Sequence, residues 1–209
     1  MAKKHYLCQR KPSIPLFMAN QEPINVAIFV SGSGTNCENL IRYFKDSDRV
    51  NISLVLSNRA DAYALERARK LGVPTAVVMK KDFNNPDILL PLLKHYAIDF
   101  IVLAGFLLII PDWLITLYDH RMINLHPALL PKYGGKGMYG HHVHEAIKAA
   151  GEKETGMTVH WVNPVCDGGE IIAQYSTPLS PDDTPDDIAA KEHELEMKYF
   201  PKVVESLLL

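Results

Sequence analysis

The chain has 209 residues, 47% of them hydrophobic and 22% charged, which is typical of a globular protein and excludes a disordered chain. Its 22 basic and 24 acidic residues leave a formal net charge of −2, without the basic excess of proteins that bind polyanions nonspecifically. The longest apolar run, Phe100 to Ile110, has 11 residues. A membrane helix needs about 20. We therefore expect neither a nucleic-acid partner nor a membrane partner.

The N-terminal segment differs in composition from the remainder of the chain. Residues 1–17 contain four basic residues and no acid, and Pro12 and Pro15 disfavour a helix there. A strand-like run begins at Ile24. We expect residues 1–23 to form a flexible extension, with Met18 as a candidate start of the native chain, and residues 24–209 to form a single domain.

The cysteines indicate the redox environment. Cys8, Cys37 and Cys166 are scattered, and no CxxC pair occurs. An odd, scattered set of cysteines is typical of reduced thiols rather than of a disulfide framework. The basic N-terminus is not followed by the apolar stretch of a signal peptide. We expect a cytoplasmic protein.

From Ile24 onward, short apolar strands alternate with segments of helical periodicity. The predicted strands are Asn25–Val30, Ile52–Leu56, Thr75–Val78, Phe100–Ala104 and Met122–Leu125, and the helices between them include Ala62–Leu71, Asp87–Tyr96 and His142–Ala150, with a further helical pattern through Leu40, Ile41 and Phe44. Such alternation is typical of right-handed βαβ units. It predicts an α/β fold with a doubly wound, mostly parallel sheet and helices on both faces.

The C-terminal part changes character. Two further strands, Thr158–Val162 and Glu170–Ser176, are joined by the turn-rich segment 163–169. Thr184 suits a helix N-cap, and it is followed by a proline and, three positions on, by an acid. We expect a long C-terminal helix that runs toward Leu209, with a kink or a restart at Pro201.

The first chemical motif is Ser31-Gly-Ser-Gly-Thr-Asn36, directly after the first strand. Its glycines permit tight backbone geometry, and the N-terminus of the following helix offers N–H groups to an anion. The Lys and Ser/Thr of a Walker loop are missing, and Cys37 stands where a dinucleotide-binding loop has its third glycine. The motif is typical of a phosphate site in a first βα turn, although a strand-to-helix turn without a ligand could have the same residues.

The second motif is Asn124-Leu-His-Pro-Ala-Leu-Leu-Pro131, after the fifth strand. Open α/β sheets bind ligands at the carboxyl ends of their strands. Asn124 and His126 are two residues apart and point to the same side of an extended segment. An amide donor beside an imidazole suits an oxyanion and a mobile proton. A structural role for a lone loop histidine stays open.

The third motif is Cys166-Asp-Gly-Gly-Glu170. A carboxylate at Asp167 could orient a histidine and raise the pKa of that histidine. The two glycines that follow make a plain turn equally natural. Spacing alone favours the turn.

Three histidines, His141, His142 and His144, stand within four residues. His141 and His142 are adjacent and cannot both share one helix face with His144. No acid or thiol stands at ligand spacing nearby. We interpret the group as a solvated helix start and predict no metal site.

The fourth motif is the apolar segment Ala104-Gly-Phe-Leu-Leu-Ile-Ile-Pro111. At the end of a strand, such a segment can form the wall of a pocket for a planar aromatic ligand. It can equally be core that continues past the strand.

Taken together, these segments resemble the phosphoribosylglycinamide formyltransferase family of purine synthesis. The matching elements, in order, are Ser31-Gly-Ser-Gly-Thr-Asn36, Ser57-Asn-Arg-Ala-Asp-Ala62, Leu65-Glu-Arg-Ala-Arg69, Leu103-Ala-Gly-Phe106, Asn124-Leu-His-Pro-Ala-Leu-Leu-Pro-Lys132, Gly156-Met-Thr-Val-His160 and Asp167-Gly-Gly169. Each is weak alone, but seven in order are specific. The resemblance runs from Ile24 to about Leu207 and leaves residues 1–23 outside.

The resemblance implies a Rossmann-like formyltransferase fold and an enzyme. Such an enzyme transfers a formyl group from its co-substrate 10-formyltetrahydrofolate to the amine of 5-phosphoribosylglycinamide (GAR). The products are formyl-GAR and tetrahydrofolate, on the route to IMP. It implies small-molecule substrates, no metal and a monomer or weak homodimer.

The resemblance also assigns roles to residues. It implies catalysis by Asn124, His126 and Asp167, with the imidazole protonated when it stabilises the oxyanion. The implied GAR-binding residues are Gly34, Thr35, Asn36, His193 and Glu196. The implied folate-binding residues are Leu107, Leu108, Ile109, Ile110, Asn163, Pro164, Val165, Cys166 and Asp167.

The sequence departs from the family pattern in two places. The family often has a folate-contacting Arg after the third strand, whereas the segment around Pro86 is short and carries none. Lys80 or Lys81 is a candidate substitute. Segment 133–140 is unusually rich in glycine, which predicts a mobile loop that closes over substrate.

Related activities fit less well. A methionyl-tRNA formyltransferase usually has an extra C-terminal domain and a basic face, and a formyl-folate hydrolase usually has an N-terminal regulatory domain. A sugar-nucleotide formyltransferase does not need the phosphate loop. A non-catalytic nucleotide sensor would be favoured by loss of Asn124, His126 or Asp167, and all three are present. A Rossmann oxidoreductase is disfavoured because no acid follows the second strand, where Ser57-Asn-Arg59 stands.

Overall fold

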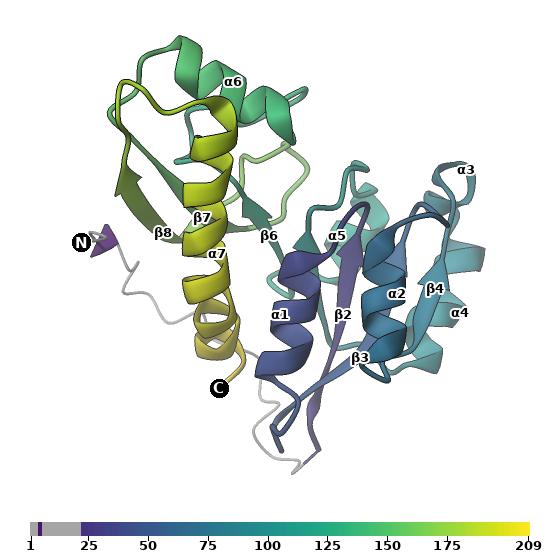
Figure 1. Cartoon of the computed structure of the whole chain (residues 1–209). Coiled ribbons are helices and arrows are strands. Elements are labelled where there is room, and N and C mark those ends of the chain that lie inside the picture. Colours follow the sequence, from purple (N-terminus) through teal and green to yellow (C-terminus); the bar gives the residue numbers. More distant parts are fainter. Residues whose placement is uncertain (1–3, 6–21) are drawn as a thin grey trace. The chain divides into compact units, whose positions relative to one another are not determined.

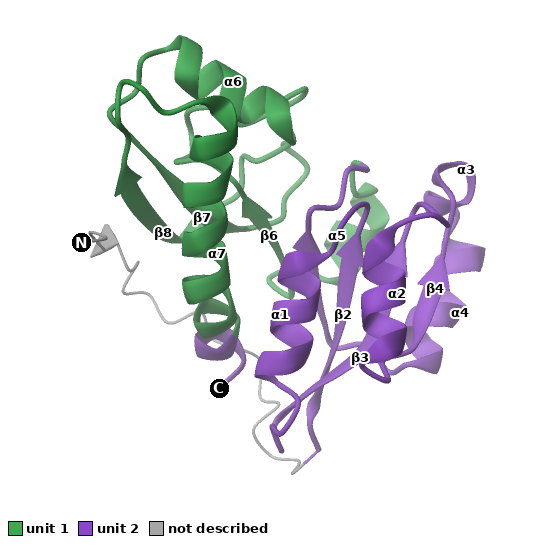
Figure 2. Ribbon diagram, viewed as in Figure 1, with its two compact units in different colours: residues 1–6, 109–204 green, residues 7–108, 205–209 purple. Residues whose placement is uncertain are grey.

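The computed structural model describes residues 4–5 and 22–209. The expected extension 1–23 and the candidate start at Met18 therefore lie almost wholly outside the described residues. The chain divides into two compact units, each described here by itself (Figure 2). Unit 1 comprises Met1–Tyr6 and Ile109–Val204, and unit 2 comprises Leu7–Leu108 and Glu205–Leu209.

Unit 2 is built on a parallel sheet of four strands. The strands are β2 (Ile24–Val30), β3 (Val50–Ser57), β4 (Thr75–Val77) and β5 (Phe100–Ala104). β2 pairs with both β3 and β5, and β4 pairs with the outer edge of β3. Every residue of β5 is buried, as is typical of a strand covered on both faces.

Four helices connect these strands. They are α1 (Thr35–Tyr43), α2 (Tyr63–Lys70), α3 (Lys80–Phe83) and α4 (Pro86–His95). Because parallel crossovers are right-handed, α1 and α2 lie on one face of the sheet (Figure 1). The return from β4 to the central strands places α4 on the other face. The predicted doubly wound α/β class is confirmed.

Unit 1 contains an antiparallel sheet. Its strands are β6 (Met122–His126), β7 (Glu154–Trp161) and β8 (Ile171–Pro178), and the short β1 (Lys4–His5) pairs with β8. Its helices are α5 (Asp112–Leu117), α6 (His141–Ala149) and most of α7 (Pro185–Leu208). The short helices α3 and α5 were not anticipated, since neither is long enough to show a period. No helix among the described residues is long and apolar enough to cross a membrane.

Helix α7 begins at the predicted cap. The backbone N–H of Thr184 donates to Asp187 Oδ2 at 2.8 Å, and the Asp187 N–H donates back to Thr184 Oγ1 at 3.2 Å. The helix is continuous through Pro201, so the predicted restart there is wrong. Buried Phe200 and Val203 flank the proline, and their packing holds the helix on both sides of it.

Candidate active site

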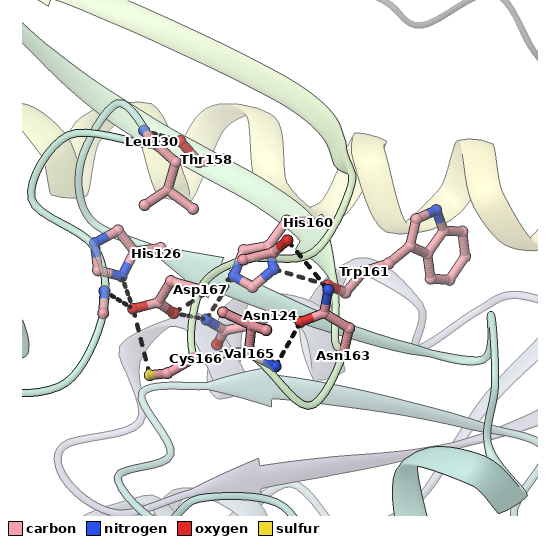
Figure 3. Close-up of polar contacts among 12 residues, drawn as sticks. Asn124, His126, Leu130, Thr158, His160, Trp161, Asn163, Val165, Cys166 and Asp167 are labelled. Carbon is pink, nitrogen blue, oxygen red and sulfur yellow. Dashed lines mark hydrogen bonds and ion pairs between the residues drawn. The ribbon is translucent and has the colours of Figure 1, made fainter.

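The pairing of β6 with β7 brings the first two polar side chains of the site together. In this antiparallel register, Asn124 stands opposite His160 and His126 stands opposite Thr158. Side chains of directly opposed residues lie on the same face of the sheet. Asn124 Nδ2 lies 3.0 Å from His160 Nε2 (Figure 3).

Backbone carbonyls select the tautomer of both histidines. His160 Nδ1 lies 2.8 Å from the carbonyl oxygen of Trp161, and His126 Nε2 lies 2.8 Å from that of Tyr133. Because a carbonyl oxygen only accepts, each of these nitrogens carries the proton. His160 Nε2 is then free to accept from Asn124, and His126 Nδ1 is left unprotonated in the neutral ring.

The carboxylate of Asp167 lies between these groups (Figure 3). Its Oδ2 is 3.7 Å from His126 Nδ1, and its Oδ1 is 3.6 Å from His160 Nε2. Asn124 Nδ2 donates to Oδ1 at 3.3 Å, and the backbone N–H of Gly135 donates to Oδ2 at 2.9 Å. The three residues assigned to catalysis by the resemblance therefore form one polar cluster.

Burial and charge set the protonation of this cluster. Burial lowers the pKa of His126, and this outweighs the opposing effect of the Asp167 carboxylate and the Tyr133 carbonyl. For Asp167, burial works to raise the pKa, but the nearby rings of His160 and His126 and the N–H of Gly135 outweigh it and leave the pKa below its usual value. The resting state is a carboxylate beside a neutral imidazole.

A tight loop carries Asp167 to this position. Asn163 Oδ1 accepts from the N–H of Val165 at 2.9 Å, and Asn163 Nδ2 donates to the carbonyl of Gly168 at 3.1 Å. Asp167 has a φ of 53°, which an Asp adopts more readily than most residues. A Cβ at Gly169 would collide with the carbonyl oxygen of Trp161. The turn interpretation of this motif is therefore confirmed, and the turn places the Asp167 carboxylate near His126 and His160.

Of the residues expected to bind folate, some are exposed and others are not. Val165 is 65% exposed, and Ile109 and Leu107 are 69% and 54% exposed. Exposed apolar side chains at these positions are compatible with contact to an apolar ring. Ile110 is buried, Leu108 and Asn163 are half-buried, and Pro164 is exposed. Lys80 and Lys81 are exposed at the start of α3, in unit 2.

The predicted phosphate loop lies in unit 2, between β2 and α1. Gly34 has a φ of 76° and directly precedes α1, whose first residues are Thr35 and Asn36. The loop is held by its neighbours: the N–H of Ala64 donates to the carbonyl of Gly32 at 3.1 Å, and Arg67 Nε donates to that of Ser33 at 2.9 Å. This leaves a rigid helix N-terminus of the kind that binds phosphate.

His193 and Glu196 lie one turn apart on α7. His193 Nδ1 is 3.4 Å from Glu196 Oε2, and this contact raises the pKa of His193. Both residues belong to unit 1, as do Asn124, His126 and Asp167. Glu196 is buried, and its charge works to raise the pKa of His126.

No motif in the sequence assigns a role to His160. The residue stood at the end of the quoted segment Gly156-Met-Thr-Val-His160, but nothing in its spacing connects it to Asn124. Only the register of β6 against β7 does so.

Each of the three clustered histidines lies near an acid, and two of them share Glu145. His142 Nδ1 lies 3.4 Å from Glu145 Oε2, and His144 Nδ1 lies 2.9 Å from Glu192 Oε2. His141 lies 3.7 Å from both Glu145 and Asp186. Within the described residues, no group of three or more His, Cys, Asp or Glu side chains has the arrangement of a metal site.

Comparison with known proteins gives the family. The formyl transferase family model matches residues 24–204. The phosphoribosylglycinamide formyltransferase of Haemophilus influenzae is 38% identical over 184 residues, which cover 86% of this chain and 84% of that protein. The chloroplastic enzyme of that name from Arabidopsis thaliana is 37% identical over 86% of this chain, and the match spans only 63% of the plant protein.

A solved structure supports the same assignment. The phosphoribosylglycinamide formyltransferase of Anaplasma phagocytophilum has a TM-score of 0.80 and 35% identity, and the match covers 88% of this chain and 86% of that one. Family match, relatives and fold agree. The chain therefore belongs to the formyltransferase family and, within it, to the phosphoribosylglycinamide formyltransferases.

Proposed function

We propose that Asn124, His126 and Asp167 carry out the formyl transfer of this phosphoribosylglycinamide formyltransferase. The enzyme takes the formyl group of 10-formyltetrahydrofolate and places it on the amine of GAR, giving formyl-GAR and tetrahydrofolate in purine biosynthesis. One observation supports the residue roles above all others. The Asp167 carboxylate lies within 3.7 Å of His126 and also bonds Asn124, so a proton acceptor and an amide donor stand side by side.

The amide of Asn124 suits an oxyanion. Attack of the amine on the formyl carbon places negative charge on the formyl oxygen, and a positioned N–H donor stabilises that charge. Asn124 Nδ2 makes its shorter contact, 3.0 Å, with His160 and its longer contact, 3.3 Å, with Asp167. The longer contact is the one that a substrate oxygen can replace while His160 continues to orient the amide.

His126 and Asp167 suit the proton that the attacking amine must lose. The neutral ring has its free nitrogen, Nδ1, on the side of Asp167. When this nitrogen takes up a proton, the adjacent carboxylate stabilises the resulting imidazolium, as in other carboxylate–imidazole pairs. The charged His126 then supports the oxyanion and returns the proton to the leaving folate nitrogen, directly or through water.

The substrate sites are also part of the proposal. Gly34, Thr35 and Asn36 bind the GAR phosphate at the N-terminus of α1, and His193 and Glu196 contact the ribonucleotide. The exposed apolar side chains of Leu107 and Ile109 support the assignment of segment 107–110, which includes Leu108 and Ile110, to the folate ring. The loop 163–167 adds backbone groups and exposed Val165. The resemblance carries these assignments, and the exposures are compatible with them.

The wider setting of the enzyme is proposed as well. Residues 24–209 act as one formyltransferase domain, consistent with the family match over 24–204. Both cysteines among the described residues, Cys37 and Cys166, are free thiols, which suits a cytoplasmic enzyme. We propose a monomer or weak homodimer that binds small molecules and neither nucleic acid nor membrane. Light scattering over a concentration series tests the oligomeric state, and a stable larger assembly would contradict it.

An assay with GAR and 10-formyltetrahydrofolate tests the function. Release of the folate product is followed by absorbance, and formyl-GAR is identified by mass spectrometry. We expect turnover that requires both substrates. A folded protein without turnover, or folate hydrolysis that is independent of GAR, would reject the proposal.

A further inference from the structure

The segment Lys132–Gly135 touches both halves of the proposed proton acceptor. The carbonyl oxygen of Tyr133 accepts from His126 Nε2 at 2.8 Å, and the N–H of Gly135 donates to Asp167 Oδ2 at 2.9 Å. The first contact keeps the proton on Nε2, and the second holds the carboxylate toward the other ring nitrogen. The position of this backbone therefore sets which nitrogen of His126 can take up a proton.

This segment has little tendency to hold its shape by itself. Tyr133 has a φ of 56°, a left-handed conformation that is costly for an aromatic residue. Glycines follow at positions 134, 135, 137 and 140, so the backbone beyond it is conformationally permissive. Something outside the segment must hold Tyr133 in place.

The contacts of Tyr133 identify what holds it. Its phenolic O–H donates to Glu152 Oε1 at 2.8 Å, and Lys132 Nζ donates to the same oxygen at 2.8 Å. Glu152 lies between α6 and β7, and its side chain is 24% exposed, against 67% for that of Lys132. Burial and the nearby Glu152 raise the pKa of Tyr133 to about 12, so the phenol stays a donor at physiological pH.

We propose that Glu152 is a positioning residue for the formyl transfer: by binding the phenol of Tyr133, it keeps the Tyr133 carbonyl on His126 Nε2 and so leaves Nδ1 as the proton acceptor beside Asp167. The inference rests on the proposed roles of His126 and Asp167. Glu152 does not touch the reacting atoms. It acts through one side chain and one backbone carbonyl, over a path in which every contact is 2.8 Å.

A simpler role for Glu152 is an ion pair with Lys132. Exposed ion pairs contribute little to stability, and an ion pair with Lys132 alone would not act on the Tyr133 carbonyl. The two roles are separable because the two partners of Glu152 can be removed one at a time. Tyr133→Phe removes the hydroxyl and keeps the ring, whereas Lys132→Met removes the ammonium and keeps most of the stem.

The kinetic test compares Glu152→Ala and Tyr133→Phe with Lys132→Met as the matched control. We expect kcat to fall about tenfold or more in the first two variants, because misplacement of a catalytic group is costly, with KM for GAR changed less than about twofold. The double variant should lose no more than either single variant. Glu152→Gln, whose amide oxygen can still accept from Tyr133, should recover part of the activity. Lys132→Met should stay within about twofold of the unaltered enzyme.

Nitrogen-15 NMR of the histidine rings gives a readout that a merely structural role would not move. In the unaltered enzyme, His126 should be mostly the Nε2–H tautomer, and Tyr133→Phe should shift the ring toward a mixture. An unchanged tautomer and unchanged kcat in Tyr133→Phe and Glu152→Ala would overturn the inference, as would an equal loss in Lys132→Met. If the unaltered enzyme fails to formylate GAR, the proposed function fails, and the NMR comparison still decides the positioning role.

Discussion

Asn124 and His160 stand directly opposite each other on β6 and β7, with Asn124 Nδ2 3.0 Å from His160 Nε2. This contact orients the amide that we assign to the oxyanion. The proton on His160 Nδ1 is in turn held by the carbonyl of Trp161. The orientation of Asn124 therefore depends on a residue that no sequence motif connects to the site.

The first prediction concerns this contact. His160→Phe keeps an aromatic ring in the buried position but removes the acceptor, so the amide of Asn124 loses its orientation. We expect kcat to fall by about 10- to 100-fold, since an oxyanion donor is usually worth about 100- to 1000-fold. Steady-state kinetics give the measurement, and the exposed His142→Phe serves as control. Unchanged kcat in His160→Phe would contradict the role.

Asp167→Asn should lower turnover sharply while the fold persists. The variant removes the charge that raises the pKa of His126, so that pKa should fall further below its usual value. We expect a loss of at least about 100-fold in kcat, because the imidazolium formed during transfer is no longer stabilised. An NMR titration of His126 measures the pKa. Wild-type turnover, or an upward shift of that pKa, would refute the assignment.

The stability of the protein should depend on pH through His126. Its pKa in the folded state lies below the unfolded value of about 6.5, so the folded protein binds this proton less readily. The stabilisation is therefore present above pH ~6.5 and is lost as the pH falls from there toward the folded-state value. Urea unfolding at several pH values should show a smaller loss on acidification for His126→Gln than for the unaltered protein. Equal losses in both would contradict this sign.

Gly34→Ala should destabilise the phosphate loop. Gly34 has a φ of 76°, and a Cβ there would collide with the Cα and Cβ of Ala64. We expect a loss of about 1–3 kcal/mol in the free energy of unfolding. Gly32→Ala, two residues earlier, is the matched control, because a Cβ at Gly32 meets nothing within 4 Å. Equal melting temperatures for the two variants would show that the loop tolerates the added carbon.

Thr35→Ala should act on the ribonucleotide. Thr35 is the first residue of α1, where a hydroxyl can add to the N–H donors that face a phosphate. We expect a higher KM for GAR, with kcat and KM for the folate nearly unchanged. An effect confined to the folate KM would place the phosphate elsewhere.

Much of the local structure follows from the sequence for identifiable reasons. The buried β5 is a continuous apolar run, and the start of α7 carries a capping box in which Thr184 and Asp187 bond each other. Each of these signals involves residues within a few positions of one another, so the sequence alone predicts the strand and the helix start. The turn at Asp167 is likewise predicted by the two glycines that follow it. Pro201 shows the limit, because neighbouring buried side chains override its local effect.

Other features depend on contacts between distant segments. Asn124 and His160 are 36 residues apart in sequence and come together through the register of β6 and β7. Tyr133 and Glu152 precede and follow α6 in sequence and come together in a hydrogen bond. Register is set by the packing of whole strands, which no single motif encodes. The protonation of His126 is a property of the tertiary structure as well, since burial decides it.

The sequence by itself determined the α/β class and the family, and it predicted Asn124, His126 and Asp167 as the catalytic residues, because motifs and periodicity are local features of the chain. The tertiary structure alone decided which nitrogen of His126 is free, which partner orients Asn124 and what holds Tyr133. These depend on distances of about 3 Å between groups that the chain brings together only on folding.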